Sequence, residues 1–259
     1  MSTTSNPPYR LLAKFYDEVL PGISEMNRHA RAKMLDGKLN GARTVCDLAC
    51  GSGSTALDFA RAGKRVFAVD NSAEFCRMVR SRTKAEKLPV KVLRADMRNF
   101  TLLEVVDMLT CEFAALNNLT DHEDLLKVFA AVFRALRPGG WFAFDINTPL
   151  AQAEQVGQGT HWIESPLFRL VMRCSVDADG RRSTIGCEWF IPVKNLWRHV
   201  RESYINIAWT EREIRQALKT AGFARPIIRD GVDVRPPGFA VKRGYDIYYL
   251  VRKPLTKSA

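Results

Sequence analysis

A glycine loop preceded by an acid is the first feature of the chain that could bind a cofactor. Asp47 stands four positions before Gly51, and the letters G-S-G-S-T-A from Gly51 onward fit the G-x-G-x-x-G/A pattern of a dinucleotide site. Such a loop binds pyrophosphate with backbone N–H groups at a helix N-terminus, where a carboxylate would repel a phosphate by about 1–4 kcal/mol at about 4 Å. The acid therefore favours a cationic donor without phosphate, attracted to a negative pocket mouth.

Further acids stand where the next two strands are expected to end. Asp70 lies 23 residues after Asp47, where a carboxylate can accept hydrogen bonds from both hydroxyls of a ribose. Asp96 follows the next apolar run. An acid does the same work in NAD enzymes, so Asp70 alone does not separate the two kinds of cofactor.

The stretch V-C-D-L-A-C-G-S-G, residues 45–53, resembles the first motif of class I S-adenosylmethionine-dependent methyltransferases, in which an acid precedes G-x-G-x-G. Ala49 replaces the first glycine, as it does in subfamilies of this group. The stretch L-R-P-G-G-W-F-A-F-D-I-N-T-P, residues 136–149, is similar to the turn and fifth strand of the family. The resemblance extends over about residues 9–253 and identifies a superfamily, without a substrate.

The resemblance implies a donor, S-adenosylmethionine, which becomes S-adenosylhomocysteine, and residues that bind it. A tyrosine in the helical lead-in closes over the cofactor, the pair after the third strand holds the adenine, and the end of the fourth strand lies near the methyl group. In this chain the implied cofactor-binding residues are Tyr16, Asp47, Ala49, Gly51, Gly53, Asp70, Asn71, Asp96, Met97, Cys111 and Phe113.

The implied reaction is a direct displacement at an activated methyl group. Its main requirement is alignment of the reacting groups, which can supply much of the ~7–11 kcal/mol available from orientation. A neutral amine needs no base, whereas a hydroxyl acceptor needs a positioned one. The candidates, among which the sequence does not choose, are Glu112, His161, Glu188, His199 and Tyr204. The spacing of cysteines and histidines predicts no metal site.

Strands and helices alternate over most of the chain. The runs TVCDLA, RVFAVD, KVLRAD, VVDMLTCEF and WFAFDI predict five strands, and PIIRD and YDIYYLVRK supply two more near the end. Ser72 and the Thr210–Glu213 capping box mark helix starts. This order predicts an α/β fold with a doubly wound, mostly parallel, seven-stranded Rossmann-like sheet.

Four segments follow from this reading. Residues 1–40 form an N-terminal helical lid, and residues 41–150 form the Rossmann-like core that binds the donor. Residues 151–209 alternate apolar with polar and predict an antiparallel β insertion after strand five, acting as a substrate cap or oligomer contact. Residues 210–259 return to the core with a helix and strands six and seven. An exposed edge of the insertion could pair two subunits as a homodimer.

Composition limits the class of protein. The net charge is +11 over 259 residues, but no tract of five or more lysines and arginines occurs, which disfavours a nucleic-acid substrate. Six cysteines without a C-x-x-C pair favour free thiols in a reducing compartment. No stretch has the eighteen apolar residues of a membrane span. A cytoplasmic protein without membrane contact is expected.

The favoured function is methyl transfer to nitrogen or oxygen of a small molecule. The insertion and the helical lead-in resemble those of small-molecule members, including glycine-type and aminosugar N-methyltransferases. An anionic substrate would find basic partners in Arg169, Arg173, Arg181 or Arg198. The alternatives are an RNA or protein methyltransferase, a non-catalytic protein that binds S-adenosylmethionine, and an NAD-dependent oxidoreductase in which Asp47 points away from the cofactor.

Overall fold

A seven-stranded sheet forms the centre of the molecule, in a computed structural model that describes residues 9–156, 159–239 and 241–255. Its strand order is β10 (Ile227–Asp230), β11 (Asp246–Arg252), β5 (Leu136–Asn147), β4 (Val106–Cys111), β1 (Thr44–Leu48), β2 (Arg65–Asp70) and β3 (Val90–Arg94). The five strands from β5 to β3 are parallel, and β11 runs antiparallel to both of its neighbours. The predicted doubly wound sheet is confirmed.

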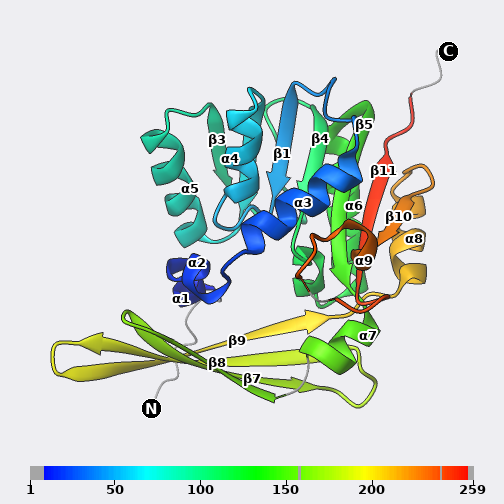
Figure 1. Cartoon of the computed structure of the whole chain (residues 1–259). Coiled ribbons are helices and arrows are strands. Elements are labelled where there is room, and N and C mark those ends of the chain that lie inside the picture. The colour runs from blue at the N-terminus through cyan, green and yellow to red at the C-terminus, as the bar shows by residue number, and fades with distance from the viewer. Residues whose placement is uncertain (1–8, 157–158, 240, 256–259) are drawn as a thin grey trace.

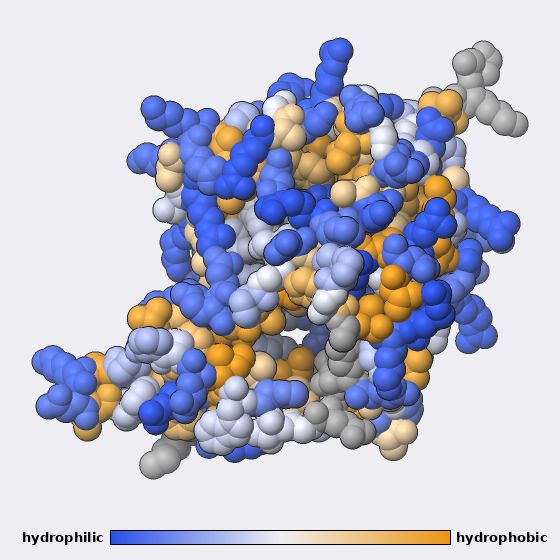
Figure 2. Space-filling view, in the orientation of Figure 1, coloured by the Kyte–Doolittle hydropathy of each residue, from blue (hydrophilic) through white to orange (hydrophobic). Residues whose placement is uncertain are grey.

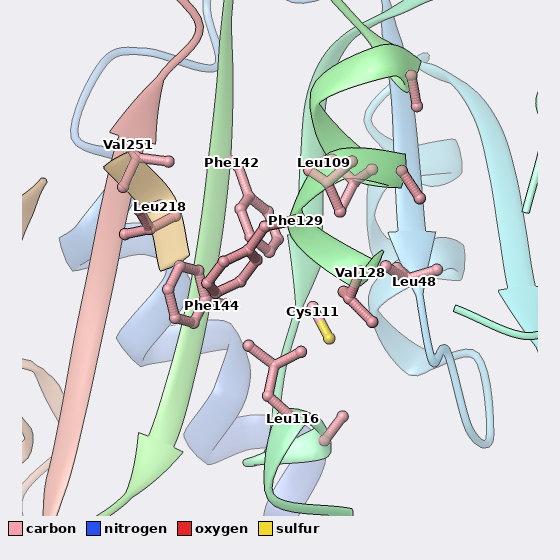
Figure 3. Packing of buried hydrophobic residues seen from close by; sticks show 14 of the residues in the cluster. Leu48, Leu109, Cys111, Leu116, Val128, Phe129, Phe142, Phe144, Leu218 and Val251 are labelled. Atoms are coloured by element: carbon pink, nitrogen blue, oxygen red, sulfur yellow. The ribbon is translucent and has the colours of Figure 1, made fainter. Parts of the chain in front are cut away.

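Helices cover both faces of this sheet (Figure 1). One face packs on α3 (Ile23–Leu35), α4 (Ser54–Arg61) and α5 (Ala73–Ala85), and the other on α6 (His122–Ala135) and α8 (Glu211–Thr220). Successive strand residues alternate between the faces. On the α6 face, Phe129 lies 5.5 Å from Phe144 of β5, measured between ring centroids, and Figure 3 shows Cys111 of β4 in the same cluster.

Local capping signals were predicted well, and one strand boundary was not. The Ser72 hydroxyl accepts the Phe75 N–H at the start of α5, and Thr210 with Glu213 forms the capping box of α8. The turn expected at residues 137–140 instead belongs to β5, which begins directly after α6. The reason is that residues 139 and 140 exchange backbone hydrogen bonds of 2.9 Å with Lys253, so the neighbouring chain extends the ladder through the turn.

The insertion is a separate four-stranded antiparallel sheet in the order β6 (Gly159–Ser165), β7 (Phe168–Val176), β8 (Arg182–Val193) and β9 (Leu196–Ile207). It follows α7 (Pro149–Ala151) and a π-type turn, η2 (Gln152–Val156). Figure 1 shows it beneath the carboxyl ends of the parallel strands. The inserted sheet therefore faces the edge at which α/β proteins bind ligands.

Two short N-terminal helices, α1 (Arg10–Lys14) and α2 (Tyr16–Val19), connect the two sheets. The linking residue Phe15 packs on the inserted sheet, with ring centroids 5.7 Å from Trp189 and 4.7 Å from Phe168. The face of the inserted sheet that carries these residues is its inner face, and alternate residues form the outer face. Figure 2 shows a hollow between the inserted sheet and the body of the molecule. We call this hollow the cleft.

No helix in the described part of the chain has the length and apolarity needed to cross a bilayer. Within the same residues, no group of three or more histidine, cysteine or acidic side chains is arranged to hold a metal ion.

Candidate active site

The glycine loop between β1 and α4 has three residues with a left-handed backbone, which glycine adopts without strain. Gly51 and Gly53 have φ values of +51° and +80°, and Ala49 has φ +54°. A Cβ on Gly53 would lie 2.6 Å from Cγ2 of Val79 in α5. Position 53 therefore requires glycine both for its left-handed backbone and for the close approach of α5.

Asp47 lies beneath the loop. Its side chain is buried, its Oδ2 accepts the Ala56 N–H of α4 at 3.0 Å, and its Oδ1 accepts the Thr110 hydroxyl at 3.4 Å. Burial, reinforced by the charge of Glu112, raises the pKa of Asp47 well above its usual range. The Ala56 N–H and the Thr110 hydroxyl hold the side chain inside the protein, and burial disfavours the negative charge expected at the pocket mouth.

Asp70 is fixed at the end of β2 in the same way. Its Oδ2 accepts the Gly51 N–H at 2.9 Å, and its Oδ1 accepts the Ser72 N–H at 2.8 Å. Burial raises the pKa of Asp70, although these amide bonds oppose the shift. Asp47 and Asp70 thus occupy amides of α4 and of the loop that a pyrophosphate would use. A donor without phosphate, such as S-adenosylmethionine, fits this site better than a dinucleotide.

The predicted adenine-contacting pair lies after the neighbouring strand β3. The Asp96 carboxylate is held by Arg98 at 2.6 Å, and this partner lowers the pKa of Asp96. Arg98 also contacts Asp124 of α6. Met97 packs partly buried against the core on the α6 face, and Asn71 is exposed after β2. These positions end adjacent strands, so the fold brings them to the same edge of the sheet.

Three tyrosines connect the lid to this edge. The Tyr16 ring meets Phe75 of α5 edge-on at 5.4 Å between centroids. The Tyr9 ring stacks on Tyr204 of β9 at 4.5 Å, and its hydroxyl donates to the Asn118 side chain. Burial raises the pKa of Tyr9 and of Tyr16, and the charge of Asp70 adds to both shifts. Tyr16, the predicted lid tyrosine, therefore lies near Asp70, and its contact with the cofactor stays a prediction.

Tyr204 is tied to a buried acid that the sequence did not reveal. Its hydroxyl donates to Oε2 of Glu202 at 2.7 Å, while Oε1 of the same carboxylate accepts the Leu11 N–H at 2.8 Å. Burial first, and then this hydrogen bond, raise the pKa of Tyr204. Tyr204 thus joins the inserted sheet to α1 and is not set up to remove a proton.

Cys111 and Phe113, both predicted to contact the cofactor, have different surroundings at the end of β4. The Cys111 thiol is fully buried in the core on the α6 face, so this predicted cofactor contact lies away from the site (Figure 3). Phe113 is 36% exposed and has φ +60°. The next residue, Ala114, also has a left-handed backbone, with φ +51°.

Glu112 is an ion-pair partner and not a free base. Its carboxylate accepts hydrogen bonds from Arg31 of α3 and from the Thr55 hydroxyl, each at 2.8 Å. Arg31 is buried and also contacts Asp58 at 2.9 Å. This network fixes the start of the loop after β4 against α3 and α4.

The two candidate histidines lie on opposite faces of the inserted sheet. His161 is exposed on β6 and pairs with Met172, which belongs to the inner face. His199 stacks on Phe190 at 4.7 Å and contacts Glu188 at 3.0 Å on the outer face. The structure therefore does not bring His199 to the carboxyl edge of the parallel strands.

The outer face also holds part of the arginine set expected to bind an anionic substrate. Arg173 pairs with Glu188, and Arg169 lies over the ring of Trp197 at 5.0 Å. Arg181 lies in the turn between β7 and β8 and pairs with Glu213 of α8 at 2.8 Å. These three arginines, which were predicted to bind an anionic substrate, therefore contact other side chains of the protein.

Asp145 of β5 is a further site residue that sequence reasoning missed. It lines a small cavity under α3 together with Arg31, Glu112 and Tyr248. Burial raises its pKa to about 7. The sequence feature that could have identified Asp145 is an acid inside the otherwise apolar run WFAFDI.

Comparisons with known proteins agree with this geometry. A family described as a methyltransferase domain matches residues 45–140. YqeM of Bacillus subtilis (strain 168), named as a methyltransferase, is 24% identical over 230 residues, covering 88% of this chain and 92% of YqeM. The crystal structure of an S-adenosylmethionine-dependent methyltransferase from Clostridium acetobutylicum matches with a TM-score of 0.79 at 21% identity, covering 95% of this chain and 99% of that one.

A second solved structure carries the donor. CalS10 from Micromonospora echinaspora, an amino pentose methyltransferase solved with S-adenosylmethionine bound, matches with a TM-score of 0.71 at 18% identity, covering 96% of this chain and 99% of that one. The motif order and the amides occupied by Asp70 and Asp47 agree with these matches. These matches identify a methyltransferase domain in residues 45–140, and the chain as a whole has the fold of S-adenosylmethionine-dependent methyltransferases.

Proposed function

We propose that the enzyme transfers the methyl group of S-adenosylmethionine to nitrogen or oxygen of a small molecule in the cleft. The observation that carries this proposal is the closure of the cleft. The lid packs on the inserted sheet through Phe15 and Trp189, and Tyr9 reaches from the lid to Asn118. Because the lid is held at several points, the cleft admits a small acceptor more readily than an RNA or a folded protein. The similar aminopentose enzyme CalS10 supports a small, sugar-like acceptor.

The donor would be held by the residues at the ends of the parallel strands. Asp70 would hold the ribose, Asp96 and Met97 the adenine, and the glycine loop with Tyr16 the remainder. S-adenosylmethionine supplies an electrophilic methyl group when bound. The chain's own contribution is to exclude water and to align the acceptor with the methyl group, and such alignment can supply ~7–11 kcal/mol. Residues 1–40 serve as the lid in this proposal, although residues 1–8 lie outside the described part.

The groups around the cleft favour nitrogen over oxygen as the acceptor atom. A hydroxyl acceptor needs a base, and among the described residues the candidates are already engaged: Glu112 by Arg31, and Tyr204 by Glu202. A neutral amine needs only its lone pair. His161 on the inner face is the candidate that would serve an oxygen acceptor.

The cellular compartment, the roles of the chain segments and subunit pairing are also proposals. The six free cysteines, five of them buried, fit a reducing compartment such as the cytoplasm. In this proposal residues 41–150 and 210–259 form the donor-binding core, and residues 151–209 form the substrate cap. Pairing of two subunits would use an edge of the inserted sheet, β6 or β9.

A labelling experiment tests the acceptor class. The enzyme is incubated with methyl-labelled S-adenosylmethionine and either a small-metabolite extract or total RNA and protein, and the labelled product is fragmented by mass spectrometry. We expect label in the small-molecule fraction, on nitrogen. An Asp70→Asn variant is the matched control for background transfer. Label that enters only RNA or protein would refute the proposal.

A further inference from the structure

The turn that follows β4 has a backbone that its residues do not favour. Phe113 and Ala114 are consecutive and both have left-handed φ values, +60° and +51°. Residues with a Cβ rarely adopt this conformation, and two in succession need support from the surrounding structure. Such strain is found where a loop is held in position for binding or catalysis.

A buried carboxylate on the neighbouring strand supplies this support. The Ala114 N–H donates to Oδ2 of Asp145 at 2.8 Å, and Asp145 is 5% exposed. The loop is also fixed further along, where the Asn117 side chain donates to the carbonyls of Asn147 and Ile207 at 2.9 and 2.8 Å. Glu112 is held by Arg31, and within the turn the Ala114 N–H is bound by Asp145 while the Ala114 carbonyl accepts the Asn117 N–H at 2.9 Å.

The turn lies beside the donor site. β4 pairs with β1, and Thr110 is the register partner of Asp47 directly before the glycine loop. Phe113, at 36% exposed, is the first exposed residue after β4, whereas Cys111 has none of its surface exposed. A change of this turn to a right-handed backbone would redirect the Phe113 side chain and the amides around it at the carboxyl edge.

We propose that Asp145 is a positioning residue, whose carboxylate holds the Phe113–Ala114 turn in the left-handed form that S-adenosylmethionine requires in order to bind. The inference concerns the donor and does not depend on which acceptor the enzyme uses. It goes beyond the residues that the motif order indicates, because Asp145 lies inside a strand and acts through a backbone amide.

The surroundings of Asp145 make this support dependent on pH. Burial raises its pKa to about 7, and the charges of Asp246 and Glu112 add to the shift, while Arg235 opposes it. The ionised carboxylate is the stronger acceptor for the Ala114 N–H. The affinity for S-adenosylmethionine should therefore increase as pH rises through about 7. The charged and titratable groups around Asp145 are Glu112 after β4, Asp246 and Tyr248 of β11, Arg235 after α9 (Gly231–Val234), and Arg31 of α3.

Titration calorimetry with S-adenosylmethionine and S-adenosylhomocysteine between pH 5.5 and 8.5 tests the proposal on the full-length chain. We expect Asp145→Ala to weaken binding at pH 8 by about tenfold or more, the size of a lost hydrogen bond to a charged group. Asp145→Asn should bind a few-fold more weakly and lose the pH dependence. Since the ligand's own titration is common to both proteins, the difference between wild type and Asp145→Asn isolates Asp145.

Two further variants separate positioning from general stability. Ala114→Gly placed in the Asp145→Ala protein should restore part of the affinity, because glycine adopts a left-handed backbone without strain. Asp107→Asn is the matched control: Asp107 also accepts backbone amides, from Arg43 and Thr44 at 2.7 and 2.9 Å, but at the opposite end of β4. It should leave affinity and pH dependence unchanged.

Either of two results would overturn the proposal. One is a wild-type affinity in Asp145→Ala at every pH. The other is the same loss of affinity in Asp107→Asn as in Asp145→Ala, which would make the effect one of stability. If Asp145→Ala does not fold, the pH profile of Asp145→Asn, which keeps the side-chain shape, decides the question.

Discussion

The carboxyl edge of the parallel sheet and the outer face of the inserted sheet use their acids differently. At the first, Asp47, Asp70 and Asp145 accept backbone N–H groups at 2.8 to 3.0 Å. At the second, Glu188 contacts only long side chains, among them His199. A backbone amide is present whatever the sequence, whereas a side-chain partner can be replaced. These contacts at the carboxyl edge therefore tolerate little change, whereas those of Glu188 on the outer face can be replaced.

Glu202 of the inserted sheet resembles the acids of the carboxyl edge and not Glu188. It belongs to the inserted sheet, yet it is buried and accepts the backbone N–H of Leu11. It occurs on the inner face, where the sheet joins the lid. For Asp47, Asp70, Asp145, Glu202 and Glu188, the division therefore follows the cleft: the first four accept backbone N–H groups, and Glu188 on the outer face is held by exposed ion pairs.

The largest expected effect comes from Trp189, which joins the inserted sheet to the lid. Its side chain is fully buried against Phe15 and Phe168, so Trp189→Ala should lower the free energy of unfolding by about 3–5 kcal/mol. Trp189→Phe should cost much less, because the indole N–H has no hydrogen-bond partner among the described residues. Urea unfolding measures both. A loss below about 1 kcal/mol in Trp189→Ala would separate the inserted sheet from the cooperative fold.

The next largest effect is expected in the glycine loop. Gly53→Ala should cost about 1–2 kcal/mol for its left-handed backbone and about 1–3 kcal/mol for its overlap with Val79. Gly51→Ala is the matched variant, because it shares the left-handed backbone and has open space around its Cβ. Adding Val79→Ala to Gly53→Ala relieves the overlap alone. Equal losses of stability and donor affinity in the two single variants would contradict the close approach of α5.

The fold could be predicted because its signals are local. The alternating apolar runs, the Ser72 cap and the Thr210–Glu213 capping box each lie within a few residues of what they determine. The missed contacts are distant in sequence: Glu202 binds Leu11 across 191 positions, and Glu112 binds Arg31 across 81. Only the folded chain brings such partners together, so no local pattern could indicate that these acids are buried and engaged.

The misplacement of Cys111 and His199 has a second physical origin, the period of two in a strand. Cys111 and Thr110 are neighbours, but the first faces α6 and the second faces Asp47. Likewise, the face on which His199 lies depends on the register of β9 against β8. A shift of one residue moves a side chain to the opposite face, and the sequence alone did not define that register.

At Asp145 we expect a smaller effect on the free energy of unfolding. This free energy should fall as pH rises, whereas the affinity for the donor should increase. Its folded pKa, about 7, lies above the value of about 4 in an unfolded chain, so the folded state holds the proton more tightly. Below about pH 4 both states are protonated, and the stability from this proton is lost as pH rises from about 4 to about 7. Asp145→Asn should therefore be more stable than wild type at pH 8 by about 1–3 kcal/mol, with little gain at pH 5.

Urea unfolding at the two pH values checks this prediction. Asp107→Asn again provides the control, and there the sign is reversed. Burial raises the pKa of Asp107, but Arg137 and the amides outweigh burial and lower it overall. Its contribution to stability is present above the unfolded pKa and is lost as pH falls through the folded one. If Asp145→Asn were less stable than wild type at both pH values, the carboxylate would stabilise the fold instead of opposing it.

The smallest effect is expected at the histidines, and they provide the sharpest test of the division along the cleft. His161 and His199 belong to the same sheet, but the first lies on the inner face and the second on the outer face. His199→Gln removes a contact with Glu188 that is exposed to solvent, so donor affinity and methyl transfer to the labelled acceptor fraction should not change. His161→Gln should lower transfer a few-fold without changing donor affinity, since it alters only the acceptor side. A loss of transfer in His199→Gln equal to that in His161→Gln would mean that the outer face also contacts the acceptor, and the cleft would then not be the boundary between fixed and variable parts of the enzyme.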